Sequence, residues 1–224
     1  MHLLFNCAIR WELADKNPIE LVRQSTKRRH VPRVLTPKEF KKLLEELEEP
    51  SRTMVLVAGS LGLRVSEILG LRWGDIDWRN LTILVQRSVV MGKLYETKTE
   101  SSHKPMPIDP LLAEALLKFR RQAKYVSADD YIFAGDNGKP RWHGIMLTDH
   151  VKPAATRAGI GKVGWHTFRH TFSSILHQAG TNMAVQKELL RHADIQTTMN
   201  LYTQAVSTAK RKAVHRVAEM LLNA

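Results

Sequence analysis

The stretch GWHTFRHTFSSIL, residues 164–176, carries two polar side chains that could bind an anion. His166 and Arg169 are three residues apart, and each stands beside an aromatic residue where the pattern predicts the start of a helix. Backbone amides at a helix start lack intrahelical acceptors and attract negative charge. An arginine adds a planar cationic fork that suits phosphate oxygens. This pair is therefore either aimed at a bound anion or simply the solvated end of a buried helix.

Three further residues with charged or reactive side chains have ordinary explanations when each is taken singly. Arg64 in GLRVSE could pair with Glu67, because three residues on a helix bring opposite charges together. Lys98 lies in a predicted hairpin, where a lysine is usually solvated. Tyr202 could be a half-buried packing residue with a solvated hydroxyl. Their significance depends on whether the fold brings them together.

The histidines and the cysteine give no sign of a metal site. His166 and His170 have the spacing of a zinc-binding helix, but Arg169 lies between them and the glutamate of a zincin motif is missing. The only cysteine, Cys7, excludes an internal disulfide and a cysteine-based zinc site. The chain also lacks a glycine-rich phosphate loop of the Walker type. We therefore expect no metal and no other cofactor.

Helices must position most of these candidates. The clearest start is at LTPKEF, where Thr36 is a predicted N-cap, Pro37 the first helical residue and Glu39 the end of a capping box. Thr167 is the predicted cap of the helix that carries Arg169 in its first turn and ends at Gly180. The other predicted helices cover residues 3–13, about 53–59, about 64–70, 110–124, a stretch ending at 159 that Pro153 could restart, 183–192, about 194–204 and 206–221.

Residues 81–108 have a different character. Three β-branched or alternating runs are separated by Gly92-Lys93 and by a polar turn at residues 100–102. This pattern predicts a small antiparallel sheet, with Lys98 next to the second turn. The predicted fold class is therefore α+β and mainly α.

The segment RQSTKRRHVPR, residues 23–33, is basic and almost without apolar side chains. We interpret it as an exposed linker. It places a domain boundary near residue 30, with the tail of one helical element in residues 1–30 and a larger domain in residues 31–224.

Composition favours a polyanionic partner. The 224 residues include 34 Lys and Arg against 22 Asp and Glu, a formal net charge of +12, and 43% are hydrophobic, enough for a core. Such a charge favours phosphate contacts and counterion release. No run is apolar and long enough to span a bilayer, the first residues do not resemble a secretory signal, and the single cysteine fits a reducing compartment. We expect a cytoplasmic protein without a membrane partner.

Taken together, four motifs in order resemble the tyrosine recombinase, or phage integrase, family. They are SLGLRVSEILGLRWGDID, ETKTESSHKPMPI, WHTFRHTFSSIL and ELLRHADIQTTMNLYTQ, which span residues 60–204. The resemblance implies catalytic roles for Arg64, Lys98, His166, Arg169, His192 and Tyr202, with Glu67 in support. The chain differs at Thr167, where the family more often has Asp or Gly, and at Arg191, where it usually has Gly.

The resemblance implies the fold of a tyrosine recombinase catalytic domain and site-specific DNA recombination through a 3′-phosphotyrosyl link formed by Tyr202. Two arginines would bind the nonbridging oxygens of the phosphodiester, where negative charge builds during attack. His166 would act as base or hydrogen-bond partner near the tyrosine, Lys98 as general acid, and His192 as a donor to a phosphate oxygen. Residues 1–30 resemble only the last helix and linker of the family's core-binding domain.

The partners implied are double-stranded DNA and, on paired sites, three more copies of the chain in a cyclic tetramer. The helix at residues 206–221 would dock on a neighbouring protomer, or fold back on its own domain in a free monomer. In the cell the protein would be nucleoid-associated when bound to DNA. Three alternatives stay open from the sequence: a type IB topoisomerase, a DNA-binding module with a vestigial pocket, and a helical adaptor with a basic surface.

Overall fold

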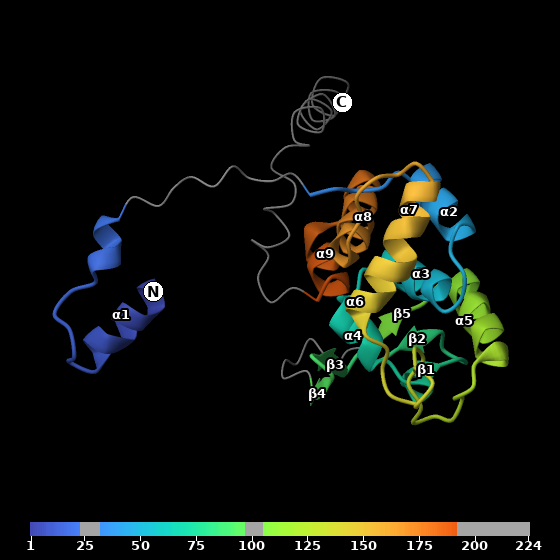
Figure 1. Ribbon diagram of the computed structural model, residues 1–224, viewed down its shortest axis with the longest axis horizontal. Coiled ribbons are helices and arrows are strands. Elements are labelled where there is room, and N and C mark those ends of the chain that lie inside the picture. The colour runs from blue at the N-terminus through green and yellow to red at the C-terminus, as the bar shows by residue number, and fades with distance from the viewer. Residues whose placement is uncertain (23–31, 97–104, 192–224) are drawn as a thin grey trace, which may run out of the picture. The chain divides into compact units, whose positions relative to one another are not determined.

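The structure is a computed structural model that describes residues 1–22, 32–96 and 105–191 (Figure 1). The chain divides into two compact units, Met1–Val31 and Pro32–Ala224. In the first unit, helix α1, His2–Arg10, is followed by a 3-10 turn, η1, Pro18–Leu21. The side chain of Asn17 caps η1 and donates to Asn6 Oδ1 at 2.7 Å, which ties the two together. The helix predicted for residues 3–13 thus begins one residue earlier and ends at Arg10.

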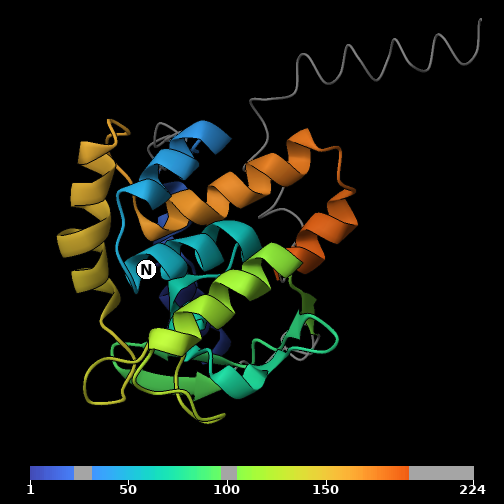
Figure 2. The ribbon, with the colours of Figure 1, turned by 90° about the vertical axis from the view of Figure 1, so that its right-hand side faces the viewer.

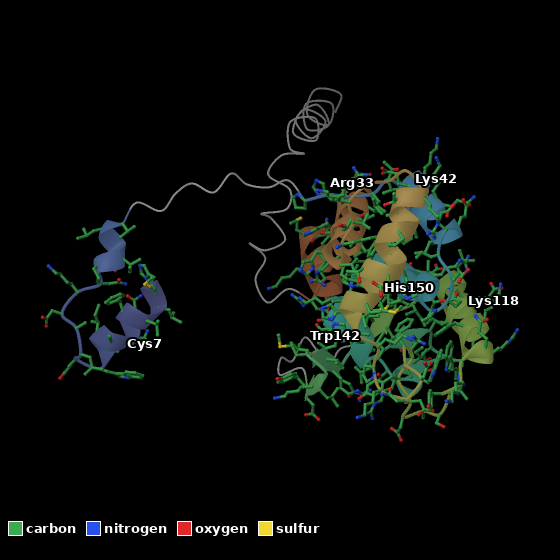
Figure 3. The ribbon with its side chains drawn as sticks, in the orientation of Figure 1. Cys7, Arg33, Lys42, Lys118, Trp142 and His150 are labelled. Atoms are coloured by element: carbon green, nitrogen blue, oxygen red, sulfur yellow. The ribbon has the colours of Figure 1, made fainter. Side chains whose placement is uncertain are left out.

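Helix α2, Pro37–Glu45, confirms the predicted capping box. The Thr36 hydroxyl accepts from the Glu39 N–H at 3.2 Å, and the Glu39 carboxylate accepts from the Thr36 N–H at 2.7 Å. These hydrogen bonds lower the pKa of Glu39. Arg33, labelled in Figure 3, is ordered by its contacts, because its Nη2 donates to Glu39 Oε1 at 2.8 Å and to the Ile160 carbonyl at 2.7 Å. Arg33 is exposed, as predicted for the basic segment, although these contacts hold its side chain, and residues 23–31 lie outside the described residues.

The second unit is built around helix α3, Ser51–Leu61, whose side chains are buried on most of its circumference. It packs between α5, Pro110–Gln122, and α8, Trp165–Gln178, while α2 covers its outer side (Figure 2). Asp109 caps α5, as Asp-Pro at a helix start predicts. A helix that is buried on most of its circumference belongs in a core, so α3 is the element against which the others are positioned.

Two small antiparallel sheets lie among the described residues, where one was predicted. The first has the order β1–β2–β5, formed by Ile76–Asp77, Thr82–Ile83 and Met106–Pro107. The second is the hairpin of β3, Arg87–Val90, and β4, Lys93–Glu96. Met91 and Gly92 form its turn with φ values of 49° and 74°, as a type I′ hairpin requires. The turn thus lies one residue before the predicted Gly92-Lys93. With these corrections, the predicted α+β, mainly α class is confirmed.

The hairpin is anchored on helix α4, Val65–Gly70. Arg87 forms an ion pair with the buried carboxylate of Asp75, and its Nε lies 3.4 Å from the Gly70 carbonyl oxygen. A Cβ at Gly70 would lie 2.7 Å from the Arg87 carbonyl oxygen. Glycine at the end of α4 therefore allows the hairpin to lie directly against that helix.

A continuous helical segment is formed by α6, His143–Ile145, the π-helical turn η4, Met146–Val151, and α7, Lys152–Arg157. Pro153 lies near the start of α7 and has no N–H to donate to the preceding turn. The helix widens before this residue instead of restarting at it. The last described helix is α9, Met183–Leu189, capped by the side chain of Asn182. None of the helices in the described ranges could cross a membrane by length and hydropathy.

Candidate active site

The site is centred on the turn that joins α3 to α4. Helix α3 ends at Leu61, and Gly62 follows with a left-handed φ of 62°. Glycine adopts this conformation without the Cβ penalty of other residues. Arg64 has extended backbone angles and is the N-cap of α4. The predicted helix-to-helix corner is therefore present, and Arg64 stands at its apex.

Glu67 holds Arg64 by both carboxylate oxygens. Its Oε2 accepts from the Arg64 backbone N–H at 2.8 Å, and its Oε1 accepts from Arg64 Nη1 at 3.1 Å. The Glu67 side chain is 7% exposed, whereas that of Arg64 is 42% exposed. Among the described residues the guanidinium donates only to Glu67. Arg64 is thus fixed at its base while much of its cationic head faces outward, so the ordinary ion pair and a functional role are compatible.

Arg169 reaches the same corner from α8. It is 6% exposed, and its Nη1 donates to the Gly62 carbonyl at 2.6 Å while its Nη2 donates to the Leu190 carbonyl. Burial, followed by the charge of Arg64, lowers the pKa of Arg169 to about 10. The guanidinium remains charged at neutral pH. Within the described part of the chain, this buried cation is held by two backbone carbonyls and not by a bonded carboxylate.

The start of α8 differs from the prediction. The helix begins at Trp165 with Gly164 as N-cap, and Thr167 is its third residue, whose hydroxyl accepts from the Gly164 N–H at 3.0 Å. Trp165 is buried, and its Nε1 donates to the His143 carbonyl at 3.0 Å. This packing sets the N-cap three residues earlier than the predicted Thr167. Arg169 accordingly lies in the second turn of α8, not in the first.

His166 is the second residue of α8 and is exposed. Its ring centroid is 6.1 Å from that of His170. Nδ1 of His170 is buried and has no hydrogen-bond partner within the described ranges. Burial, then the charges of His166 and Arg169, lower the pKa of His170. His166 can therefore meet a ligand, whereas His170 is held in its neutral form beneath it.

Arg191 is a fourth charged residue at the site, with a role that the motif comparison does not assign. It follows α9 with a left-handed φ of 53° and is 8% exposed. Burial lowers its pKa, the negative charge of Glu67 raises it and the charge of Arg64 lowers it. Its only sequence signal is its position, which the family usually fills with Gly.

The structure thus brings together three of the seven predicted site residues, Arg64, Glu67 and Arg169, and places His166 on the first turn of the helix that carries Arg169. Lys98, His192 and Tyr202 lie outside the described residues. Glu67 is bonded to Arg64, and its charge raises the pKa values of the nearly buried Arg169 and Arg191, so among the described residues of this cluster the positive charges outnumber the negative. Such a site is suited to binding an oxyanion. Within the described ranges, no group of three or more histidine, cysteine or acidic side chains could hold a metal ion.

Comparison with known proteins identifies the family of this chain. Residues 33–208 match the model of the phage integrase family. The tyrosine recombinase XerA of Pyrococcus furiosus is 32% identical over 200 residues, which cover 86% of this chain and 64% of that protein. A XerC-like tyrosine recombinase of Caldanaerobacter subterraneus is 29% identical over 209 residues, 82% of this chain and 53% of its own length. The chain therefore spans between half and two thirds of these two relatives.

Solved structures share the fold. The integrase of transposon Tn1549, in complex with transposon right end DNA, has a TM-score of 0.77 and 25% identity, and the match covers 97% of this chain and 76% of that one. A crystal structure of a XerA recombinase has a TM-score of 0.63 and 22% identity, with 95% of this chain covered and 73% of the other. The predicted fold of the large domain is thus confirmed.

Proposed function

Because this chain belongs to the phage integrase family, the tyrosine recombinases, we propose that it is a site-specific DNA recombinase. It would cut one strand of duplex DNA by forming a 3′-phosphotyrosyl bond to Tyr202 and rejoin a strand by reversing that step. The observation that carries the proposal is the convergence of Arg64 and Arg169 on the Gly62 corner.

The two arginines would bind the phosphate at the cleavage position. Attack on a phosphodiester builds negative charge on its nonbridging oxygens, and donors fixed in advance stabilise that charge most. Arg169 is locked by two carbonyls and Arg64 by Glu67, so neither has to be ordered when DNA binds. By analogy with other oxyanion donors, loss of either guanidinium costs about 2.7 to 4 kcal/mol of transition-state stabilisation.

The remaining roles follow the family motifs. Tyr202 would be the nucleophile, assisted by His166, while Lys98 would protonate the 5′-oxygen that leaves. His192 would donate to a phosphate oxygen. As the family motifs imply, the proposed reaction uses neither ATP nor a metal.

The proposed assembly is a cyclic tetramer on paired DNA sites, with residues 31–224 as the catalytic domain and residues 1–30 as the tail of a core-binding domain. Relatives of this chain are described in complex with DNA, among them the Tn1549 integrase. Because the proposed substrate is chromosomal or mobile-element DNA, we place the protein in the cytoplasm, at the nucleoid when bound.

The test is covalent trapping on a nicked suicide duplex made from the DNA that flanks the gene. Wild-type protein is expected to form an adduct that survives denaturing electrophoresis, and Tyr202→Phe is expected to form none. An equal amount of adduct from the variant would disprove the choice of nucleophile. Adduct formation together with efficient relaxation of any supercoiled plasmid would instead identify a topoisomerase. A wild-type chain without adduct would be a DNA-binding remnant or a helical adaptor with a basic surface.

A further inference from the structure

Arg191 has a backbone conformation that its residue type does not favour. Its φ of 53° lies in the left-handed region, where a side chain crowds the following carbonyl and glycine does not. Its N–H donates to the Glu188 carbonyl at 3.0 Å, which fixes this geometry at the end of α9. A strained residue that is also nearly buried is a reason to ask what its side chain does.

The surroundings of Arg191 are those of the proposed phosphate site. Arg169 donates to the carbonyl of Leu190, the preceding residue, and to the carbonyl of Gly62. The end of α9 and the corner that carries Arg64 are therefore held together by a single guanidinium. Arg191 also lines a cavity of about 190 Å³ with Pro105 and Met106. Arg191 thus lies at a cavity between strand β5 and α9, next to the residue whose carbonyl Arg169 binds.

The charge balance of this cluster indicates an electrostatic role for Arg191. Among the described residues at the Gly62 corner, Arg64 and Arg169 carry two positive charges, and Glu67 offsets one of them. One remaining charge matches a phosphodiester in its ground state but not the second negative charge that develops during attack. Arg191, nearly buried at the end of α9, adds a third positive charge that the charge of Glu67 affects.

We propose that Arg191 is a positioning residue that offsets the negative charge of Glu67, so that the charges of Arg64 and Arg169 act on the attacked phosphate. The inference rests on the proposed function, since it concerns the same phosphate. It assigns a role to a residue that the family motif fills with Gly, and it makes the effect of Arg191 electrostatic instead of a direct contact.

The experiment compares Arg191→Gly and Arg191→Lys with wild type on two nicked duplexes. One carries the ordinary phosphodiester at the mapped cleavage position, and the other carries an uncharged methylphosphonate there. Arg191→Gly removes the charge and relieves the left-handed backbone, whereas Arg191→Lys keeps the charge. Arg121→Gln, on the exposed face of α5, is the control for the loss of one positive charge elsewhere.

We expect Arg191→Gly to slow adduct formation on the phosphodiester by about tenfold, the scale of a unit charge nearby at low screening. Its rate on the methylphosphonate should stay within about twofold of wild type, because the charge it compensates is absent. Arg191→Lys should recover most of the rate, Arg121→Gln should lose none, and the melting temperature of Arg191→Gly should not fall.

Two results would overturn the inference. One is wild-type cleavage of the phosphodiester by Arg191→Gly, and the other is an equal loss on both duplexes with a lower melting temperature, which would make Arg191 structural. If wild type forms no adduct at all, the proposed function fails. The role of Arg191 is then tested by the binding of inorganic phosphate. Phosphate should raise the melting temperature of wild type more than that of Arg191→Gly, and equal increases would reject the role.

Discussion

Arg64 and Arg169 are both proposed to bind the attacked phosphate, but Arg64 is partly exposed and Arg169 is buried. Arg169 is 6% exposed and is oriented by backbone carbonyls, so its direction is set by the fold itself. The Arg64 side chain is 42% exposed and is oriented by one carboxylate, so it retains hydrogen-bonding capacity toward solvent or a ligand. A buried cation without a bonded carboxylate is costly. An anion that binds at this corner recovers part of that cost, which links stability to function at the level of single residues.

His170 makes a residue-level prediction about pH. Burial, then the charges of His166 and Arg169, lower its folded-state pKa below the ordinary 6.5. As pH falls through 6.5 the unfolded chain takes up a proton that the folded state resists, so stability decreases until the folded pKa is passed. The free energy of unfolding in urea should therefore drop between pH 7.5 and 5.5, and it should drop less in His170→Gln.

The matched control for this titration is His150→Gln, since His150 is an exposed residue of the π-helical turn (Figure 3). It should retain the wild-type drop. If His170→Gln and His150→Gln both lose as much stability as wild type, the buried histidine is not the group responsible.

At the scale of elements, the α3–α4 corner depends on Gly62. A Cβ there would lie 2.3 Å from Cδ1 of Phe172, and φ is 62°. Gly62→Ala should therefore cost about 2 to 4 kcal/mol, from the left-handed backbone and from overpacking. Gly159 has a φ of 70° but nothing within 4 Å of a built Cβ, so Gly159→Ala should cost only about 1 to 2 kcal/mol.

Urea denaturation of both variants measures this difference directly. The excess loss in Gly62→Ala isolates the contact between the corner and α8, on which the hydrogen bond from Arg169 to the Gly62 carbonyl depends. Equal losses would mean that Phe172 moves aside easily and that the corner is not rigid.

Elements were predictable from the sequence wherever their signals are local. The Thr36 capping box and the helix start at Asp109-Pro110 depend on residues within a few positions, and both are present. The turn before Arg64 is present too, but α3 continues to Leu61, past the predicted end near residue 59. The start of α8 was not predictable, because the packing of Trp165 against the His143 carbonyl selects Gly164 over Thr167. The burial of Arg191 beside Glu67 likewise comes from the meeting of α9 and the corner, which are far apart in the chain.

At the scale of the whole molecule, the two units differ in how many hydrophobic side chains they bury. The buried hydrophobic residues of the described chain begin at Leu35, whereas α1 buries none of its side chains. Leu3, Leu4 and Trp11 are at least 70% exposed. The charge cluster and the core both belong to Pro32–Ala224, so the chemistry proposed above is a property of the second unit.

The formal net charge of +12 predicts how the whole chain binds duplex DNA of any sequence. Each phosphate that it neutralises adds about 0.9 to the slope of log affinity against log salt concentration. The basic segment at residues 23–33 supplies three adjacent cations, Lys27, Arg28 and Arg29. If these contact phosphates, their replacement by alanine should reduce the measured slope by about 2 to 3.

The control is a second triple variant with the same loss of charge on exposed positions of α2 and α5. It combines Lys41→Ala, Lys42→Ala and Lys118→Ala. Direct phosphate contacts by the basic segment predict a clearly smaller slope for the first variant than for the second. Equal slopes would show that net charge acts through the general field of the molecule. Fluorescence anisotropy on a short duplex between 50 and 200 mM salt covers the range in which contacts of this number change affinity measurably.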